Sequence, residues 1–245
     1  MPIQPPDFRV LRRFDPEFLT DEDLEDLASF TGMDVDECRH RVESYSLEEH
    51  AERWRAEPPQ TADELLAFYN STDLYLWELM QWHASRERAP YWEALTYLAE
   101  HYPPEAGYRR VYDFGCGVGT DALYLASKGY DVTLVDVDGP AFQFAQHRFE
   151  RRGLAARFVE SRSTLPEPAG EYDVAICFDV FEHLPEPLEA ARRLVAALRP
   201  GGLLFEQSTF DFEAVHPCHL NGGINRYSGS RWRLHLAGLG LKPIA

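Results

Sequence analysis

A glycine-rich turn between two apolar segments constrains the fold of this chain more than any other feature. The stretch from Val111 to Asp136 reads VYDFGCGVGTDALYLASKGYDVTLVD. Its pattern predicts a strand, a turn, a helix and a second strand, in that order. Glycines let the backbone approach a ligand closely, and the helix N-terminus offers free N–H groups. Asp136, at the carboxyl end of the second strand, can accept both hydroxyls of a ribose, so a nucleoside-bearing ligand is our first hypothesis.

The spacing of the glycines decides between kinds of nucleoside. A dinucleotide site needs G-x-G-x-x-G, but residue 120 is threonine and the third glycine comes one position early. The segment from Asp113 to Gly119 has the pattern D-x-G-x-G-x-G, which resembles the first motif of the class I, Rossmann-like S-adenosylmethionine-dependent methyltransferases. In that family the loop packs against the methionine part of the cofactor, which has no diphosphate. An NAD-dependent dehydrogenase is therefore the weakest alternative.

The second half of the chain continues to alternate between strand-like and helical segments. Strands are predicted at residues 157–160, 172–178 and 203–207, and helices at 139–152, 187–198 and 230–239. This alternation predicts an α/β fold with a mostly parallel, doubly wound sheet flanked by helices. We expect residues 241–245 to begin a sixth strand and the C-terminal hairpin of the family to be shortened.

A second block of sequence resembles the same family. It contains F-D-V-F-E-H-L-P-E-P and L-R-P-G-G, and together the two blocks cover about residues 108–240. The resemblance implies S-adenosylmethionine as cofactor. The cofactor-binding residues that it implies are Asp113, Gly115, Cys116, Gly117, Gly119, Asp136, Val137, Ser161, Phe178 and Asp179. Ser161 stands where the family often has an aspartate that contacts the adenine amine, so we expect that contact to be weaker or to move to the backbone or to Arg162.

The first hundred residues read as acidic and helical. Capping-box spacing at Thr20, Asp34, Ser46 and Thr61 predicts four short helices. We divide the chain into a small helical N-terminal region (1–60), helices that form a lid or flank (61–105) and the cofactor-binding core (106–245). In many small-molecule methyltransferases a helix before the first motif covers the cofactor with a tyrosine. The resemblance makes Tyr69 the candidate for that position, and we expect Trp77 to approach the same space.

Two pairs of residues supply candidates for catalysis. His216 and His219 follow the predicted fifth strand, where the family commonly builds its acceptor pocket, and an imidazole titrates near neutral pH. We therefore expect His219, with His216, to act as general base or to orient the acceptor. Glu182 and His183 are expected to cap a short helical turn and to pack beneath it. No metal site is expected, because the additional acids of metal-dependent methyltransferases are not evident.

Composition limits the kinds of partner and the cellular location that we expect for this chain. The net charge of −17 disfavours a nucleic-acid substrate, since few positive charges would neutralise phosphates. Four cysteines lie far apart without a C-x-x-C pair, which indicates free thiols in a reducing cytoplasm. No apolar run approaches the roughly 20 residues needed to span a bilayer, and the N-terminal residues do not read as a signal peptide.

These observations predict an enzyme that transfers a methyl group from S-adenosylmethionine to O, N or C of a small-molecule acceptor. One alternative uses the same cofactor without methylating, through transfer or cyclisation of its aminocarboxypropyl arm. A third reading is a catalytically silent cofactor-binding scaffold.

Overall fold

A central parallel sheet carries the fold. The computed structural model describes residues 18–161, 170–210, 218–220 and 227–244. The strands are β1 (Arg110–Phe114), β2 (Asp131–Asp136), β3 (Arg157–Glu160), β4 (Tyr172–Phe178) and β5 (Leu198–Gln207), in the order β3-β2-β1-β4-β5. Every pairing is parallel. The order reverses between β1 and β4, and in such sheets ligands bind beyond the carboxyl ends of the strands at this reversal.

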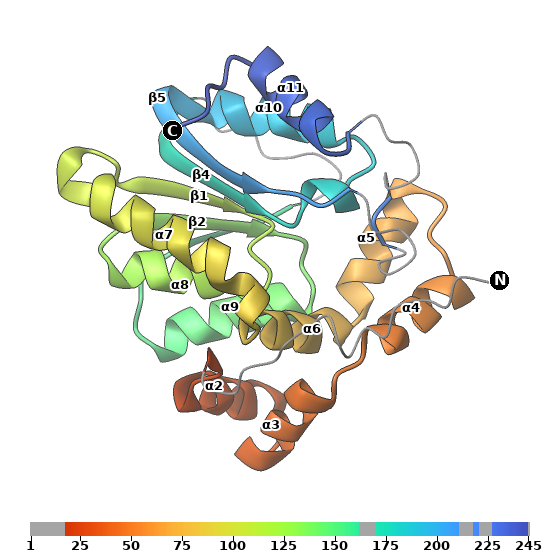
Figure 1. The fold of residues 1–245 in the computed structure, drawn as a ribbon. Helices are drawn as coiled ribbons and strands as arrows, with labels where there is room; N and C mark the ends of the chain where they lie inside the picture. The colour runs from red at the N-terminus through yellow and green to blue at the C-terminus, as the bar shows by residue number, and fades with distance from the viewer. Residues whose placement is uncertain (1–17, 162–169, 211–217, 221–226, 245) are drawn as a thin grey trace.

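Helices cover both faces of the sheet (Figure 1). One layer consists of α7 (Ala89–His101), α8 (Thr120–Ser127) and α9 (Pro140–Arg151), and the other of α10 (Pro187–Ala197) and α11 (Ser230–Gly238). Alternate residues of β1 serve the two layers, as strand geometry requires: Val111 joins the α7–α8–α9 core, whereas Tyr112 joins the core beneath α10 and α11. The predicted doubly wound α/β sheet is confirmed.

The N-terminal part adds four short helices and a fifth that packs on the core. These are α2 (Asp21–Thr31), α3 (Val35–Ser44), α4 (Leu47–Ala56), α5 (Ala62–Ser71) and α6 (Leu74–His83). Full capping boxes begin α2, α3 and α5. The box predicted at Ser46 is wrong in one respect, since the Ser46 hydroxyl accepts from the Glu48 backbone N–H and not from Glu49.

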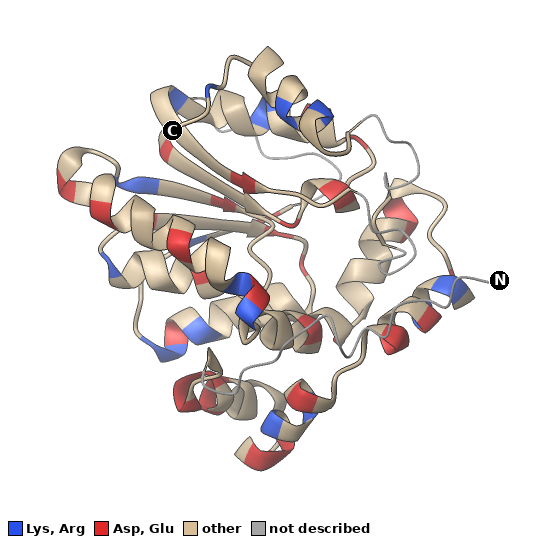
Figure 2. Ribbon diagram, viewed as in Figure 1, with Lys and Arg blue, Asp and Glu red and all other residues tan. Residues whose placement is uncertain are grey.

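An ion-pair network fastens α2 to α9. The side chain of Arg148 is 1% exposed, and its Nη2 contacts Asp23 at 2.6 Å. Its Nη1 donates to the carbonyl of Val118 in the glycine loop at 2.7 Å. Arg152 joins the network through Asp26, which is fully buried. Figure 2 shows the acidic positions of α2 beside basic positions at the end of α9. The network ties the N-terminal helices to the glycine loop.

Three further sequence predictions differ from the structure. Strand β5 begins at Leu198, five residues earlier than predicted, because residues 198–202 continue the strand past a register shift opposite β4. Residues 241–244 form no strand, and Pro243 there has no N–H to donate to a ladder. Trp77 is buried in the apolar cluster of α2, α3 and α6 and does not line the cavity described below, so it does not share that space with Tyr69.

No helix in the described ranges is long and apolar enough to cross a membrane.

Candidate active site

A cavity of about 710 Å³ opens beyond the carboxyl ends of β1, β2 and β4. Helices α5 and α6 form the opposite wall, so segments distant in sequence meet here (Figure 1). The volume is within the range of small-molecule sites. Of the residues predicted for the cofactor, the cavity is lined by Tyr69, Asp113, Gly115, Cys116, Gly117, Asp136, Val137, Ser161, Phe178 and Asp179.

The carboxylate of Asp136 is held by two backbone groups. Gly117 N–H donates to its Oδ2 and Val137 N–H to its Oδ1, each at 2.7 Å. Burial raises the pKa of Asp136 to about 6, although these two hydrogen bonds oppose the shift. Each carboxylate oxygen still has lone-pair capacity for a further donor. Asp136 can therefore accept two ribose hydroxyls while it keeps the glycine loop in place.

Each of the three loop glycines is required for a different structural reason. All have positive φ. A Cβ on Gly117 would lie 2.5 Å from Leu79 of α6, and one on Gly115 would lie 2.3 Å from a methyl of Val180. Gly119 does not line the cavity: its Cβ would meet Ala145 of α9 at 2.9 Å. A side chain at Gly117, which lines the cavity, would therefore also strike α6.

Asp113 places an unpartnered acceptor at the end of β1. The residue is 3% exposed, and among the described residues its Oδ2 has no hydrogen-bond partner. Burial, followed by the charges of Asp121 and Asp136, raises the pKa of Asp113 well above its ordinary value. A cationic ammonium group would satisfy this oxygen and offset the cost of burying it. The position suits the amino group of a methionine-like ligand end.

Sequence reasoning missed Arg88, which lies between α6 and α7. It is 2% exposed, lines the cavity and contacts both carboxylate oxygens of Asp121, with Oδ2 at 2.6 Å. Its guanidinium also stacks over the ring of Tyr91, 4.4 Å from the centroid. A buried arginine among carboxylates can receive the carboxylate of the same ligand end. The only signal was an R-E-R run before a helix, which reads as solvent-exposed.

Asp179 occupies a strained position after β4. Among the described residues it is the one non-glycine with positive φ, at 55°. The hydroxyl of Tyr91 donates to its Oδ1 at 2.7 Å, and the backbone N–H of Asp179 donates to the Gln207 carbonyl at 2.8 Å. Such strain persists only where surrounding contacts enforce it, and it is concentrated at functional sites. Here it turns the chain toward the cavity for the residues that follow.

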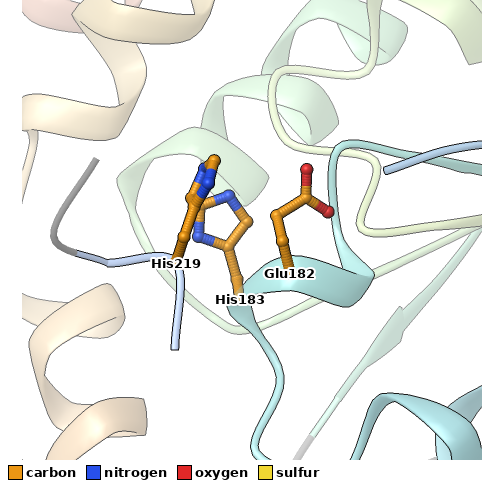
Figure 3. Close-up of side chains that lie close together, drawn as sticks. All are labelled: Glu182, His183 and His219. Carbon is orange, nitrogen blue, oxygen red and sulfur yellow. The ribbon is translucent and has the colours of Figure 1, made fainter. Parts of the chain in front are cut away.

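Glu182 and His183 follow Asp179 closely, and His219, from the segment after β5, lies beside them (Figure 3). The rings of His183 and His219 are perpendicular, with centroids 4.7 Å apart. Glu182 is 1% exposed, and its Oε1 accepts from the Thr209 backbone N–H at 2.9 Å. The expected helix-capping function of Glu182 is wrong, because the turn Phe181–His183 has no side-chain cap and Glu182 accepts from Thr209 instead. His183 packs against the ring of His219, and both Glu182 and His183 line the cavity.

Tyr69 connects this group to the wall formed by α5. Its hydroxyl lies 3.3 Å from Nδ1 of His183. Tyr69 thus lies at the cavity, as expected, and its function as a lid stays a prediction. His219 lines the same cavity. His216 and Arg162 fall outside the described residues.

The lining that α4 and α5 contribute is apolar apart from Tyr69, and this part of the cavity is called the apolar end below. Leu47 of α4 and Ala62, Leu65 and Leu66 of α5 line it. These side chains offer no hydrogen bonds, so they suit the carbon skeleton of an acceptor and exclude water. The cavity therefore has a polar end at the glycine loop, an apolar end at α4 and α5, and the Glu182–His183–His219 group on its wall.

Comparison with known proteins agrees with this geometry. A family described as "Methyltransferase domain" matches residues 82–244, more than half of the chain. The chain is 35% identical over 101 residues to the ubiquinone biosynthesis O-methyltransferase of Bordetella avium (strain 197N), covering 40% of this chain and 41% of that protein. The enzyme of the same name from Vibrio parahaemolyticus serotype O3:K6 (strain RIMD 2210633) is 33% identical over 99 residues, covering 40% of this chain and 42% of that protein.

The chain spans less than half of the length of these two curated relatives. A solved structure from Bacillus halodurans C-125, described as a methyltransferase, superposes with a TM-score of 0.51 at 19% identity, covering 62% of this chain and 69% of that one. This likeness supports the fold. The chain belongs to the methyltransferase-domain family, and its cofactor is S-adenosylmethionine.

Proposed function

We propose that this protein transfers a methyl group from S-adenosylmethionine to a hydroxyl oxygen of a small, partly apolar molecule. The observation that carries the proposal is the single cavity that joins the glycine loop and Asp136 to the Glu182–His183–His219 group. The cofactor supplies an electrophilic methyl carbon on a sulfonium. The protein has to bind it, exclude water and hold a nucleophile in line.

On the donor side, each polar residue is assigned to one group of the cofactor, and its surroundings fit that contact. Asp136 accepts the ribose hydroxyls, and Asp113 and Arg88 hold the amino and carboxylate groups of the methionine end. Val137 and Ser161 flank the adenine. Of the predicted cofactor residues, only Gly119 is not proposed to contact the cofactor, because its lack of a side chain serves the packing of α8 against α9.

On the acceptor side, the apolar end of the cavity binds the carbon skeleton and the hydroxyl faces the Glu182–His183–His219 group. The relatives named as ubiquinone biosynthesis O-methyltransferases favour oxygen as the methylated atom. The hydroxyl proton leaves toward this group, in which His219 is the candidate base from the sequence. Proximity and orientation supply most of the rate enhancement.

The division of the chain into residues 1–60, 61–105 and 106–245 remains part of this proposal, with the middle segment covering the cavity. A cytoplasmic location rests on the cysteines, which are free and buried at all four positions. A small-molecule acceptor, rather than a nucleic acid, remains the proposed partner because of the acidic balance of the chain.

The test incubates the protein with S-adenosylmethionine and a panel of phenols, catechols and aliphatic alcohols. We expect S-adenosylhomocysteine and an O-methylated product by mass spectrometry. Methylthioadenosine in its place would instead support chemistry at the aminocarboxypropyl arm, and cofactor binding without any product across broad panels would favour a scaffold. His219→Ala should lower turnover by roughly 10²–10⁴-fold with unchanged affinity for S-adenosylhomocysteine.

A further inference from the structure

We propose that Glu182, His183 and His219 bind a divalent transition-metal ion on the acceptor side of the cavity. This inference rests on the proposed function for its chemistry, but its binding site stands on the geometry alone. One ligand atom from each of the three residues lies within 4.8 Å of the others. Figure 3 shows the three side chains close together, two from η4 (Phe181–His183) and one from the segment that carries His219.

The carboxylate of Glu182 is oriented but incompletely satisfied. Its Oε1 accepts from Thr209 N–H, whereas Oε2 is buried and has no hydrogen-bond partner among the described residues. A buried carboxylate oxygen without a partner is costly, and a cation removes that cost. The backbone of Glu182 adds a second restraint, because its carbonyl accepts from Leu220 N–H at 2.9 Å. That bond joins the segments that carry the carboxylate and His219.

Tyr69 provides the outer support that a metal-bound histidine usually has. Histidines that bind metal through one ring nitrogen commonly hydrogen-bond through the other, which fixes the tautomer and the ring orientation. The Tyr69 hydroxyl lies 3.3 Å from His183 Nδ1, which assigns metal binding to Nε2. Tyr69 would then act on the metal site as a positioning residue.

The three protein ligands determine which class of metal ion fits the site. Two imidazoles and one carboxylate suit Zn²⁺, Fe²⁺, Co²⁺ or Mn²⁺, whereas Mg²⁺ and Ca²⁺ prefer oxygen ligands. Three protein ligands leave a coordination position open, as in catalytic zinc sites. The three residues line the cavity, so that position is accessible to an acceptor.

A metal there would activate the acceptor without a dedicated base. Coordination lowers the pKa of a hydroxyl, so the oxygen becomes nucleophilic near neutral pH and its proton passes to water. The oxygen–carbon bond then forms as the carbon–sulfur bond breaks, which gives the methyl ether and S-adenosylhomocysteine. His219 would serve as a metal ligand in place of a base.

The binding test uses untagged protein stripped with a chelator and titrated with Co²⁺. We expect visible d–d absorption bands of bound cobalt and a Zn²⁺ competition that removes them. Glu182→Gln, His183→Ala and His219→Ala should abolish the bands, and Tyr69→Phe should weaken the affinity by roughly 10–100-fold. The matched control is His101→Ala, since His101 is exposed at the end of α7 and should leave the titration unchanged.

Folding of each variant is checked by thermal melting and by S-adenosylhomocysteine affinity. Cobalt spectra of the hydrated ion, or equal bands in the folded variants and the parent, would overturn the metal site. If the stripped protein turns over as fast as the Zn²⁺-loaded or Mn²⁺-loaded protein, the activating function is overturned while methyl transfer stands. If the protein binds Co²⁺ through these residues but neither binds nor consumes S-adenosylmethionine, the site stands and the proposed function fails.

Discussion

The backbone N–H of Gly117 donates a 2.7 Å hydrogen bond to Oδ2 of Asp136, so the glycine loop and the end of β2 hold each other in place. The same carboxylate is proposed to accept the ribose hydroxyls. Asp136→Ala should therefore lose those contacts and loosen the loop. Each hydrogen bond to a charged acceptor is worth about 1.5–3 kcal/mol, so affinity for S-adenosylhomocysteine should fall at least roughly tenfold.

Isothermal titration calorimetry measures this change. Asp138→Ala is the matched control, because Asp138 lies two residues further on, is exposed and accepts a hydrogen bond from the Gln143 side chain. Equal affinities in Asp136→Ala and the parent would remove Asp136 from the ribose contact.

Binding of the cofactor product should weaken in acid. Burial raises the pKa of Asp136 from 3.8 to about 6, and ribose hydroxyls donate to the ionised form. Affinity should therefore be constant above pH 6 and fall by up to about tenfold for each pH unit below it. The stability of the unbound protein has the opposite sign: ionising Asp136 costs stability as pH rises from 3.8 to about 6, and that cost persists above this range. Calorimetry across pH checks the first effect, and Asp136→Asn should flatten the profile.

Gly117→Ala should reduce both melting temperature and cofactor affinity. The backbone at Gly117 has φ of +52°, which costs an L-residue about 1–2 kcal/mol, and the added methyl would lie 2.5 Å from Leu79. Leu79→Ala removes that neighbour, so the double variant should lose less stability than the sum of the two single variants. Strict additivity in thermal denaturation would show that the contact with Leu79 does not matter.

Arg148→Met should destabilise the protein by about 3–5 kcal/mol, because it leaves buried carboxylates of α2 with fewer partners. It also removes the donor to the Val118 carbonyl, so affinity for S-adenosylhomocysteine should fall as well. Denaturant unfolding and calorimetry measure the two effects. Arg55→Ala is the control: Arg55 and its partner Glu48 are both exposed, so the loss should be below about 1 kcal/mol. A similar loss in both variants would argue against the network.

Much of the fold could be predicted because local signals agree with the tertiary structure. The buried run of β4 and the glycine turn after β1 are encoded within a few residues, and the capping boxes at Thr20 and Asp34 form as predicted. The start of β5 was misplaced because Pro200, Gly201 and Gly202 are turn-forming residues, yet Leu198 before them and Leu203 after them both pair with β4. Pairing is a long-range effect that a local pattern does not contain.

The candidate site also has one part that could be predicted from the sequence and one part that could not. Asp113, the glycine loop and Asp136 lie within one strand–turn–helix–strand unit, so their positions at the cavity could be predicted from the motif. Arg88 and the approach of His219 to Glu182 depend on how α6, α7 and the segment after β5 pack around that unit. No spacing in the sequence links His183 with Tyr69, which is 114 positions away and reaches it only through the fold.

The apolar end of the cavity belongs to α4 and α5, whereas Asp113 and Asp136, the proposed contacts for the amino group and the ribose, belong to the sheet. Substitutions at Leu47, Leu65 or Leu66 can therefore reshape the space for an acceptor without touching Asp113 or Asp136. An enzyme built in this way can change its substrate range through its N-terminal helices while its use of the methyl donor stays constant. Directed evolution for new acceptors should begin with those three leucines.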